Sequence, residues 1–205
     1  VHRRKPQNNQ TNDLLLQLGK LYCRTGKYKN AIVLLEKEKV LEKTSPTIPG
    51  RYVLLRYLGE AYAGSGRNKE AVTVLQRAIR YNPHDAHTLS LLGELYALEN
   101  QGYDIALSLC QQAVNIDDRH WKHWYRLAVV KYRMIEYEAA LVAVKQSLQR
   151  EQKNEASLYL AGKVYEKKGL HAKAAAMFKA VLKITPEHKA ARAAFKGIKL
   201  HLKKR

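Results

Sequence analysis

The apolar residues of this chain recur at helical spacing, in blocks that short turns separate. Leu55, Leu58 and Tyr62 lie three and four residues apart, which places them on one face of a helix. The Gly-Ser-Gly stretch at 64–66 interrupts this period, and the same spacing resumes over residues 71–78. The pattern predicts a unit of two amphipathic helices joined by a tight turn.

A Leu-Gly or Ala-Gly pair followed by Tyr marks the first helix of several such units. The copies are Leu18-Gly19 with Tyr22, Leu58-Gly59 with Tyr62, Leu92-Gly93 with Tyr96, and Ala161-Gly162 with Tyr165. In a further, degenerate copy, Ala128 takes the place of the glycine. Positions 19, 59, 93, 128 and 162 are 40, 34, 35 and 34 residues apart. Self-similarity at this period predicts a solenoid of stacked repeats.

The recurring glycine predicts close contact between the two helices of a unit. A glycine inside a helix costs about 1 kcal/mol relative to alanine, so its recurrence requires a compensating contact. A small residue opens the second helix twelve positions later, Ala71 after Gly59 and Ala174 after Gly162. We therefore expect the two backbones to approach closely at these small residues.

The repeated residues resemble the tetratricopeptide repeat (TPR) family, whose pattern extends over 34 residues. The copy at 51–85 carries Leu55, Leu58-Gly59, Tyr62, Ala71, Leu75, Ala78 and Pro83. Trp124 takes the family's Trp position in the next copy but one, and the last copy carries Leu158, Gly162, Tyr165, Ala174, Phe178 and Pro186. The resemblance implies an all-α, right-handed superhelix of about five helix-turn-helix repeats.

The pattern divides the chain into three parts. Residues 1–11 form a basic and polar extension, residues 12–186 form five repeats, and residues 187–205 form a basic amphipathic helix that caps the array. The repeats are predicted at about 12–50, 51–85, 86–120, 121–154 and 155–186. The apolar face of this C-terminal helix consists of Ala191, Phe195, Ile198 and Leu202. Elsewhere in the chain, Asp85, Asp117 and Asp118 are predicted to be N-cap residues of helices.

Composition narrows the classes of function. The chain has 205 residues, 46% of them apolar, and 37 Lys and Arg against 18 Asp and Glu give a formal charge of +19. Acidic protein segments or polyanions are therefore expected partners. No apolar run approaches the roughly 18 to 20 residues of a membrane span. Cys23 and Cys110 have no paired spacing, so we expect buried thiols and a cytoplasmic location. Because the chain starts at Val1, it is interpreted as a segment of a longer protein.

No catalytic signature occurs in the sequence, so the chain is not expected to be an enzyme or to hold a cofactor. His84 with His87, and His120 with His123, have the i, i+3 spacing that can place two metal ligands on one helix face. Neither pair has a third ligand at a recognisable spacing. We therefore predict no metal site.

The TPR resemblance implies that the first helices of the repeats line a concave, peptide-binding groove. Transferring the family's groove positions selects Lys20, Arg24, Arg56, Lys122, Tyr125, Arg126, Tyr132, Arg133, Tyr159, Lys163 and Lys167. The same positions add Asp13, Glu60, His87, Glu94 and Glu166. Bases outnumber acids, so the predicted ligand is an acidic peptide, held mainly by repeats four and five.

The sequence departs from the carboxylate clamp found in some family members. These members bind a C-terminal carboxylate with two Lys, one Arg and two Asn. Here the basic positions fall on Arg56, Lys122 and Arg126, but the Asn positions fall on Glu60 and Leu91, so this clamp is not expected.

Two other functions remain alternatives. The basic surface could bind nucleic acid or another polyanion, or the chain could be the regulatory module of a larger enzyme.

Overall fold

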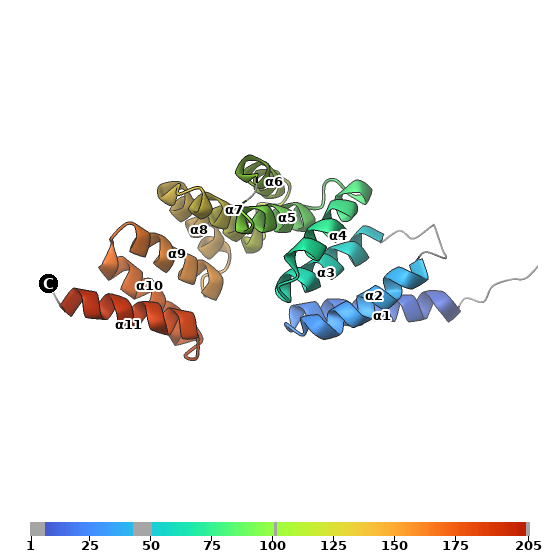
Figure 1. Ribbon diagram of the computed structural model, residues 1–205, viewed down its shortest axis with the longest axis horizontal. Helices are drawn as coiled ribbons and strands as arrows, with labels where there is room; N and C mark the ends of the chain where they lie inside the picture. Colours follow the sequence, from blue (N-terminus) through green and yellow to red (C-terminus); the bar gives the residue numbers. More distant parts are fainter. Residues whose placement is uncertain (1–6, 43–50, 101, 204–205) are drawn as a thin grey trace, which may run out of the picture.

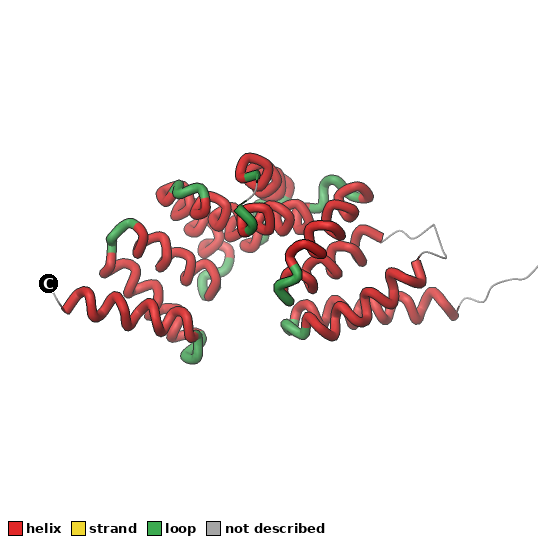
Figure 2. Tube along the Cα trace, in the orientation of Figure 1, coloured by secondary structure: helices red, strands yellow, loops and turns green. Residues whose placement is uncertain are grey.

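The computed structural model describes residues 7–42, 51–100 and 102–203. Within these ranges the chain forms eleven α-helices and no strand (Figure 2). The helices are α1 (Gln7–Arg24), α2 (Tyr28–Glu42), α3 (Arg51–Gly64), α4 (Asn68–Tyr81), α5 (Ala86–Leu98), α6 (Tyr103–Ile116), α7 (Trp121–Arg133), α8 (Tyr137–Arg150), α9 (Glu155–Lys167), α10 (His171–Ile184) and α11 (Lys189–Lys203). The all-α class predicted from the sequence is confirmed.

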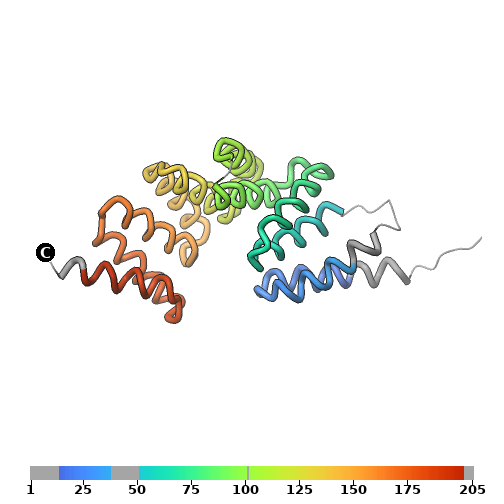
Figure 3. The backbone as a smooth tube through the Cα atoms, viewed as in Figure 1, coloured from blue at the N-terminus to red at the C-terminus, as the bar shows by residue number. Residues whose placement is uncertain are grey.

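The helices stack into an arched array, with α5, α6 and α7 at its apex (Figure 1). Successive odd-numbered helices pack on one another as well as on the even-numbered helices beside them. We call α1, α3, α5, α7 and α9 the inner row. Its path through the arch can be followed in Figure 3, and α6 lies on the outer side, above α5 and α7. The inner row is therefore the concave surface of a solenoid.

The core consists of the apolar stripes that the repeat predicts. Leu55, Leu58 and Leu75 are fully buried, as is Phe178 near the other end of the chain. Each of these side chains comes from a position where the helical period places an apolar residue. Burial of this size stabilises the fold by roughly 1.5 to 3 kcal/mol for each such side chain.

The glycines of the inner row mark close contacts with the second helix of each unit. A Cβ at Gly59 would lie 2.5 Å from the Leu75 side chain, and one at Gly162 would lie 2.5 Å from the Phe178 ring. At these two glycines the nearest atoms belong to a large buried residue of the second helix. At Gly93 the added atom would also lie 2.7 Å from a backbone atom, the carbonyl oxygen of Ala106.

Two of the three predicted N-caps are wrong. Asp85 caps α5 as expected, since its carboxylate accepts a hydrogen bond from the Thr88 backbone N–H at 2.9 Å. At α7 the cap is His120, whose Nδ1 accepts from the Lys122 N–H at 3.2 Å. Asp117 instead ends α6, and Asp118 caps neither helix. The loop before α7 is two residues longer than a cap at Asp118 would require, which brings an imidazole to the capping position.

Helix α11 packs on α10 at the end of the array. Ala191 and Ile198 are buried there and Phe195 is partly buried, while the side chain of Leu202 lies outside the described residues. Lys196 and Lys199 are exposed on the other side. Over the described residues, none of the helices is long and apolar enough to cross a bilayer.

Candidate functional site

A pocket of about 270 Å³ opens on the inner row, between α1, α3, α5 and α7. We call it the inner pocket. Six of the predicted groove residues meet in it, four of them basic, although they come from four different helices. Its lining is Arg24, Arg56, Tyr57, Glu60, His87, Leu91, His120, Lys122 and Arg126. Stacking of the first helices brings these residues together, so the pocket exists only in the assembled array.

Arg126 is the most buried cation of the inner pocket, with 8% of its surface exposed. Its Nε donates to Glu94 at 3.0 Å, and its Nη1 donates to the Ser90 hydroxyl at 2.9 Å and the His87 carbonyl at 3.3 Å. A buried charge requires such partners, because its desolvation is otherwise uncompensated. Arg126 therefore joins α7 to α5, and most of its charge is already matched.

Arg56 forms a second ion pair at the pocket. Its Nη1 lies 3.2 Å from an Asp85 carboxylate oxygen, and its guanidinium carbon lies 4.6 Å from the centroid of the Tyr57 ring. Lys20 does not line the pocket, but its Nζ lies 5.6 Å from the same ring. Tyr57 thus holds two cations by contact with its aromatic face.

Lys122 and Arg24 carry the charge that a ligand can reach. Lys122 Nζ lies 3.6 Å from Glu60, and the two side chains are 38% and 29% exposed. A pair this exposed contributes about 0 to 1 kcal/mol, so a ligand carboxylate can replace Glu60. Arg24 is exposed and forms no salt bridge with the described part of the chain. The pocket therefore offers two accessible cations beside two that are already paired.

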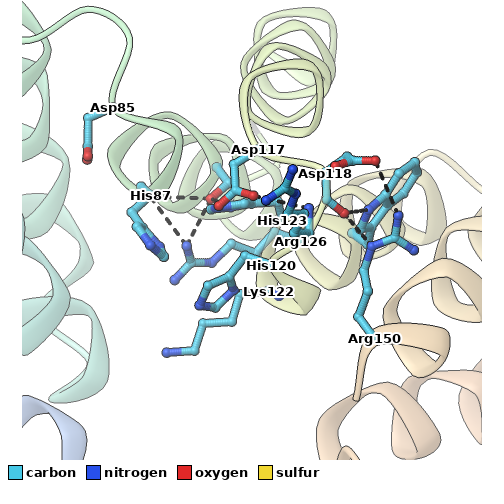
Figure 4. Close-up of polar contacts among 12 residues, drawn as sticks. Asp85, His87, Asp117, Asp118, His120, Lys122, His123, Arg126 and Arg150 are labelled. Carbon is cyan, nitrogen blue, oxygen red and sulfur yellow. Dashed lines mark hydrogen bonds and ion pairs between the residues drawn. The ribbon is translucent and has the colours of Figure 1, made fainter. Parts of the chain in front are cut away.

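Three histidines form a cluster at the pocket, two of them in its lining. The ring centroids of His87, His120 and His123 lie 4.7 Å, 4.8 Å and 5.2 Å apart, and Figure 4 shows them beside Arg126 and Lys122. The sequence groups the histidines as two pairs along the chain. The fold instead joins one member of the first pair to both members of the second, while His84 is exposed.

The most buried of these rings, His123, lies beside the Ser90 hydroxyl and the Asp117 carboxylate. The Ser90 hydroxyl lies 2.8 Å from His123 Nδ1 and accepts a hydrogen bond from Arg126. The hydroxyl has one proton to donate, and the His87 carbonyl oxygen, 3.3 Å away, is a second acceptor within its reach. His123 Nε2 lies 3.7 Å from an Asp117 carboxylate oxygen.

The histidine cluster is neutral at neutral pH. Burial lowers the pKa of His123 to about 3, and nearby His87 and Arg126 add to the effect. Burial likewise lowers the pKa of His87 to about 4, assisted by His120 and Arg56, and lowers the pKa of His120. Three uncharged imidazoles between two guanidinium groups form a polar wall that adds no charge to the pocket.

The described residues include no group of three His, Cys, Asp or Glu side chains arranged to hold a metal ion. In the histidine cluster, one ring nitrogen of His123 faces Ser90 and one of His120 caps α7. The adjacent Arg56 and Arg126 would also repel a cation. The chemistry of the cluster therefore suits hydrogen bonding within the protein better than metal coordination.

Both cysteines are buried free thiols, as the sequence predicts. Burial raises the pKa of Cys23 to about 12 and also raises the pKa of Cys110. A thiol reacts as its thiolate, so neither group is an effective nucleophile at neutral pH.

Apart from Lys122 and Arg126, the predicted groove residues of repeats four and five lie outside the inner pocket. Lys163 is bound by Glu166 at 2.6 Å, and Arg133 and Lys167 are exposed. The tyrosines pack against other rings: Tyr125 on Trp121, Tyr132 on Tyr137, and Tyr159 on Phe178 and His188. The side chain of Asp13 lies outside the described residues. Dominance of repeats four and five in ligand binding thus stays a prediction.

Sequence reasoning missed Tyr57 and gave His120 a different role. Tyr57 precedes the Leu58-Gly59 pair and follows a groove arginine, which is the signal that could have selected it. His120 entered only as a metal-ligand candidate. Its place in the pocket depends on the start of α7, which the predicted caps put at the wrong residue.

Comparison with known proteins agrees with this architecture. A family model described as ChAPs (Chs5p-Arf1p-binding proteins) matches residues 3–183. Protein bimA of Emericella nidulans is 31% identical over 77 residues, which cover 38% of this chain and 9% of bimA. The chain therefore spans less than a tenth of that relative.

Solved structures with the same fold are TPR proteins. A thermophilic TPR protein from Thermus thermophilus superposes with a TM-score of 0.76 at 21% identity, covering 92% of this chain and 99% of its own. A TPR protein from Parabacteroides merdae gives 0.65 at 16% identity, covering 95% and 75%. YrrB, described as a TPR protein with an unusual peptide-binding site, gives 0.58 at 19% identity, covering 89% and 90%. The TPR fold is thereby established.

Proposed function

The chain belongs to the ChAPs family of Chs5p-Arf1p-binding proteins, and from this premise we propose that it is a non-catalytic scaffold whose inner pocket binds an acidic segment of a partner protein. The family description names two protein partners, which favours a protein ligand. YrrB, similar in fold, is described by its peptide-binding site. Both descriptions support binding rather than catalysis.

The accessible cations of the inner pocket carry the proposal. Lys122 holds Glu60 only loosely, at 3.6 Å, and Arg24 lines the same pocket without a salt bridge to any described residue. An incoming carboxylate would displace Glu60 and contact both cations. Leu91 and Tyr57 supply apolar surface beside them. One acidic residue flanked by an apolar one therefore fits the chemistry of the lining.

Variants that change the charge of the pocket test the proposal. Their affinity for a short, fluorescein-labelled, Glu-rich peptide is measured by fluorescence anisotropy at about 0.15 M salt. Lys122→Glu should weaken binding by about 5- to 150-fold, equivalent to roughly 1 to 3 kcal/mol for a charge-assisted hydrogen bond. Glu60→Gln should strengthen binding, because it frees Lys122. Lys196→Glu is the matched control, since Lys196 is exposed on α11 and far along the chain.

The net charge of +19 supports a second candidate, weak binding of polyanions such as RNA. Such binding depends on the number of phosphates neutralised and falls steeply as salt rises. It would respond equally to Lys122→Glu and Lys196→Glu. Equal losses from these two variants would therefore contradict the pocket proposal and favour the polyanion.

A further inference from the structure

A second cavity, of about 520 Å³, lies between α8, α9 and α10 and shares no residue with the inner pocket. We call it the outer groove. Its walls are mainly apolar, and their principal side chains are Leu141, Val142, Leu148, Ala161, Tyr165 and Met177. Val142 has 62% of its surface exposed. An exposed apolar side chain at the edge of an apolar cavity marks a surface suited to association.

The groove results from the way in which the helices stack. α8 and α10 each pack on α9. Ala161 of α9 forms part of the floor, and its short side chain leaves the space between the two outer helices unfilled. A gap of this size has the volume of an ordinary ligand pocket.

The walls favour a helical occupant over an extended one. Helices α8, α9 and α10 bond their backbone groups internally, so the groove offers no row of free N–H and C=O groups to an extended segment. A helix satisfies its own backbone and needs only apolar side chains that fit the groove. Residues Leu141, Lys145 and Leu148 repeat along α8 at helical spacing, which matches the spacing of anchors on a second helix.

The charge of the segment that forms the groove favours an acidic partner. Residues 141–183 contain nine Lys or Arg against three Glu, and Lys145 is the one of these basic residues on the lining. Lys145 is exposed on the lining, and Lys173 Nζ lies 5.8 Å from the Tyr165 ring centroid. A second copy of this chain would bring a further +19 to a basic surface, so charge opposes self-association here. We infer that the outer groove docks an amphipathic helix with acidic flanks from a partner protein.

Selection from a displayed library of short helical peptides tests the inference, with the full chain as target and the Val142→Asp variant as counter-target. Enriched peptides should carry large apolar residues at i, i+4 and i+7 and acidic residues beside them. Affinity of the soluble consensus peptide should fall at least about tenfold in Val142→Asp. Lys145→Glu should lower the affinity about three- to tenfold, whereas Lys179→Glu, exposed on α10 outside the lining, should change it less than about twofold.

Each other outcome overturns the inference. Circular dichroism verifies that the variants fold, and Lys145→Glu tests the groove independently of Val142. No enrichment, enrichment of basic peptides, or unchanged affinity in Val142→Asp would contradict the acidic helix. Dissociation of a dimer by Val142→Asp in sedimentation would show a second copy in the groove instead. Lys122→Glu should leave this peptide's affinity unchanged, which separates the outer groove from the inner pocket.

Discussion

The interface between α5 and α7 and the interface between α10 and α11 belong to the same fold but bury opposite kinds of side chain. Ser90, His123 and Arg126 are buried between α5 and α7. Between α10 and α11 the buried residues are apolar, among them Phe178 and Ile198. The first interface depends on a network in which Arg126 donates to Glu94, Ser90 and the His87 carbonyl, and the second depends on packing alone.

This difference means that the two interfaces respond differently to pH and to substitution, although they belong to one repeat architecture. Apolar packing tolerates changes in pH, because it contains no group that titrates. A buried polar network loses stability when one member is removed or charged, because the remaining groups stay desolvated. The inner pocket lies on the polar interface, so binding and local stability are expected to change together there.

Arg126→Met should have the largest effect. The change keeps much of the side chain's volume but leaves Glu94, whose side chain is 18% exposed, without its cation. Loss of one partner from such a buried pair costs about 3 to 5 kcal/mol. Urea unfolding followed by circular dichroism measures the loss. Arg133→Met, on the exposed side of the same helix, should cost less than about 0.5 kcal/mol. Equal costs for the two variants would show that the polar network contributes nothing.

Acid should weaken the α5–α7 interface before the rest of the fold. The groups facing His87 and His123 are His120, Arg56, Arg126, Asp85 and Asp117. The folded pKa values of about 4 and about 3 lie below the ordinary 6.5, so the unfolded chain binds more protons in between. Stability is therefore complete above about pH 6.5 and falls as pH decreases to 3 or 4. Each histidine contributes at most about 1.4 kcal/mol per pH unit.

The two tryptophans of the chain, Trp121 and Trp124, both lie in α7 and report on this interface. Their fluorescence should change at a higher pH than the helical circular dichroism. His123→Gln should reduce the pH dependence of the fluorescence, whereas His84→Gln, at an exposed position, should leave it unchanged. Coincident fluorescence and helix transitions in the unmodified protein would contradict local acid sensitivity.

Gly93→Ala should destabilise the protein by about 1 to 3 kcal/mol, as overpacking does. Its Cβ would meet the Ala106 carbonyl oxygen and the Cys110 sulfur, each at 2.7 Å, and a backbone atom cannot rotate away. Gly197→Ala in α11 is the matched control, because nothing lies within 4 Å of its Cβ. That variant should gain up to about 1 kcal/mol from helix propensity. Thermal unfolding compares the two, and a gain at both positions would contradict close packing at Gly93.

The fold was predictable because the same sequence pattern occurs in each of the five repeats. The Leu-Gly pairs, the alanines and the turn glycines recur in phase, so an error at one copy is corrected by the others. The contact made by each glycine was less predictable. Gly59 and Gly162 meet Leu75 and Phe178 because the two helices cross where those large side chains lie, and periodicity does not define the crossing point.

The site was predictable only in part, because pairing of charges depends on distances between repeats. Sequence positions selected Arg24, Arg56, Lys122 and Arg126 for the groove, and the stacking of first helices brings them to one pocket. They could not show that Glu94 neutralises Arg126, since the two residues lie 32 positions apart. Nor could they show the histidine cluster, which forms across α5 and α7 rather than along one helix.

The turns before α8 and α10 differ in the type of residue at one backbone position. In each turn a residue at positive φ lies two positions before the second helix of the repeat, Ile135 at 66° and Gly169 at 70°. The two turns form similar backbone hydrogen bonds. The Ile135 N–H donates to the Tyr132 carbonyl at 3.1 Å, and the Gly169 N–H donates to the Glu166 carbonyl at 3.0 Å. A left-handed conformation costs a side-chain-bearing residue about 1 to 2 kcal/mol, and a β-branched one is the least suited to it.

Ile135→Gly should therefore stabilise the protein by about 0.5 to 1 kcal/mol, after subtracting the greater freedom of glycine in the unfolded chain. Ile135 is 69% exposed, so little packing is lost with its side chain. Gly169→Ala should have the opposite sign and cost about 1 kcal/mol, because no atom lies within 4 Å of its Cβ and only the backbone opposes the change. Urea unfolding of both variants gives the two signs. A loss of stability in Ile135→Gly would mean that the isoleucine side chain contributes more at the surface than its backbone strain removes.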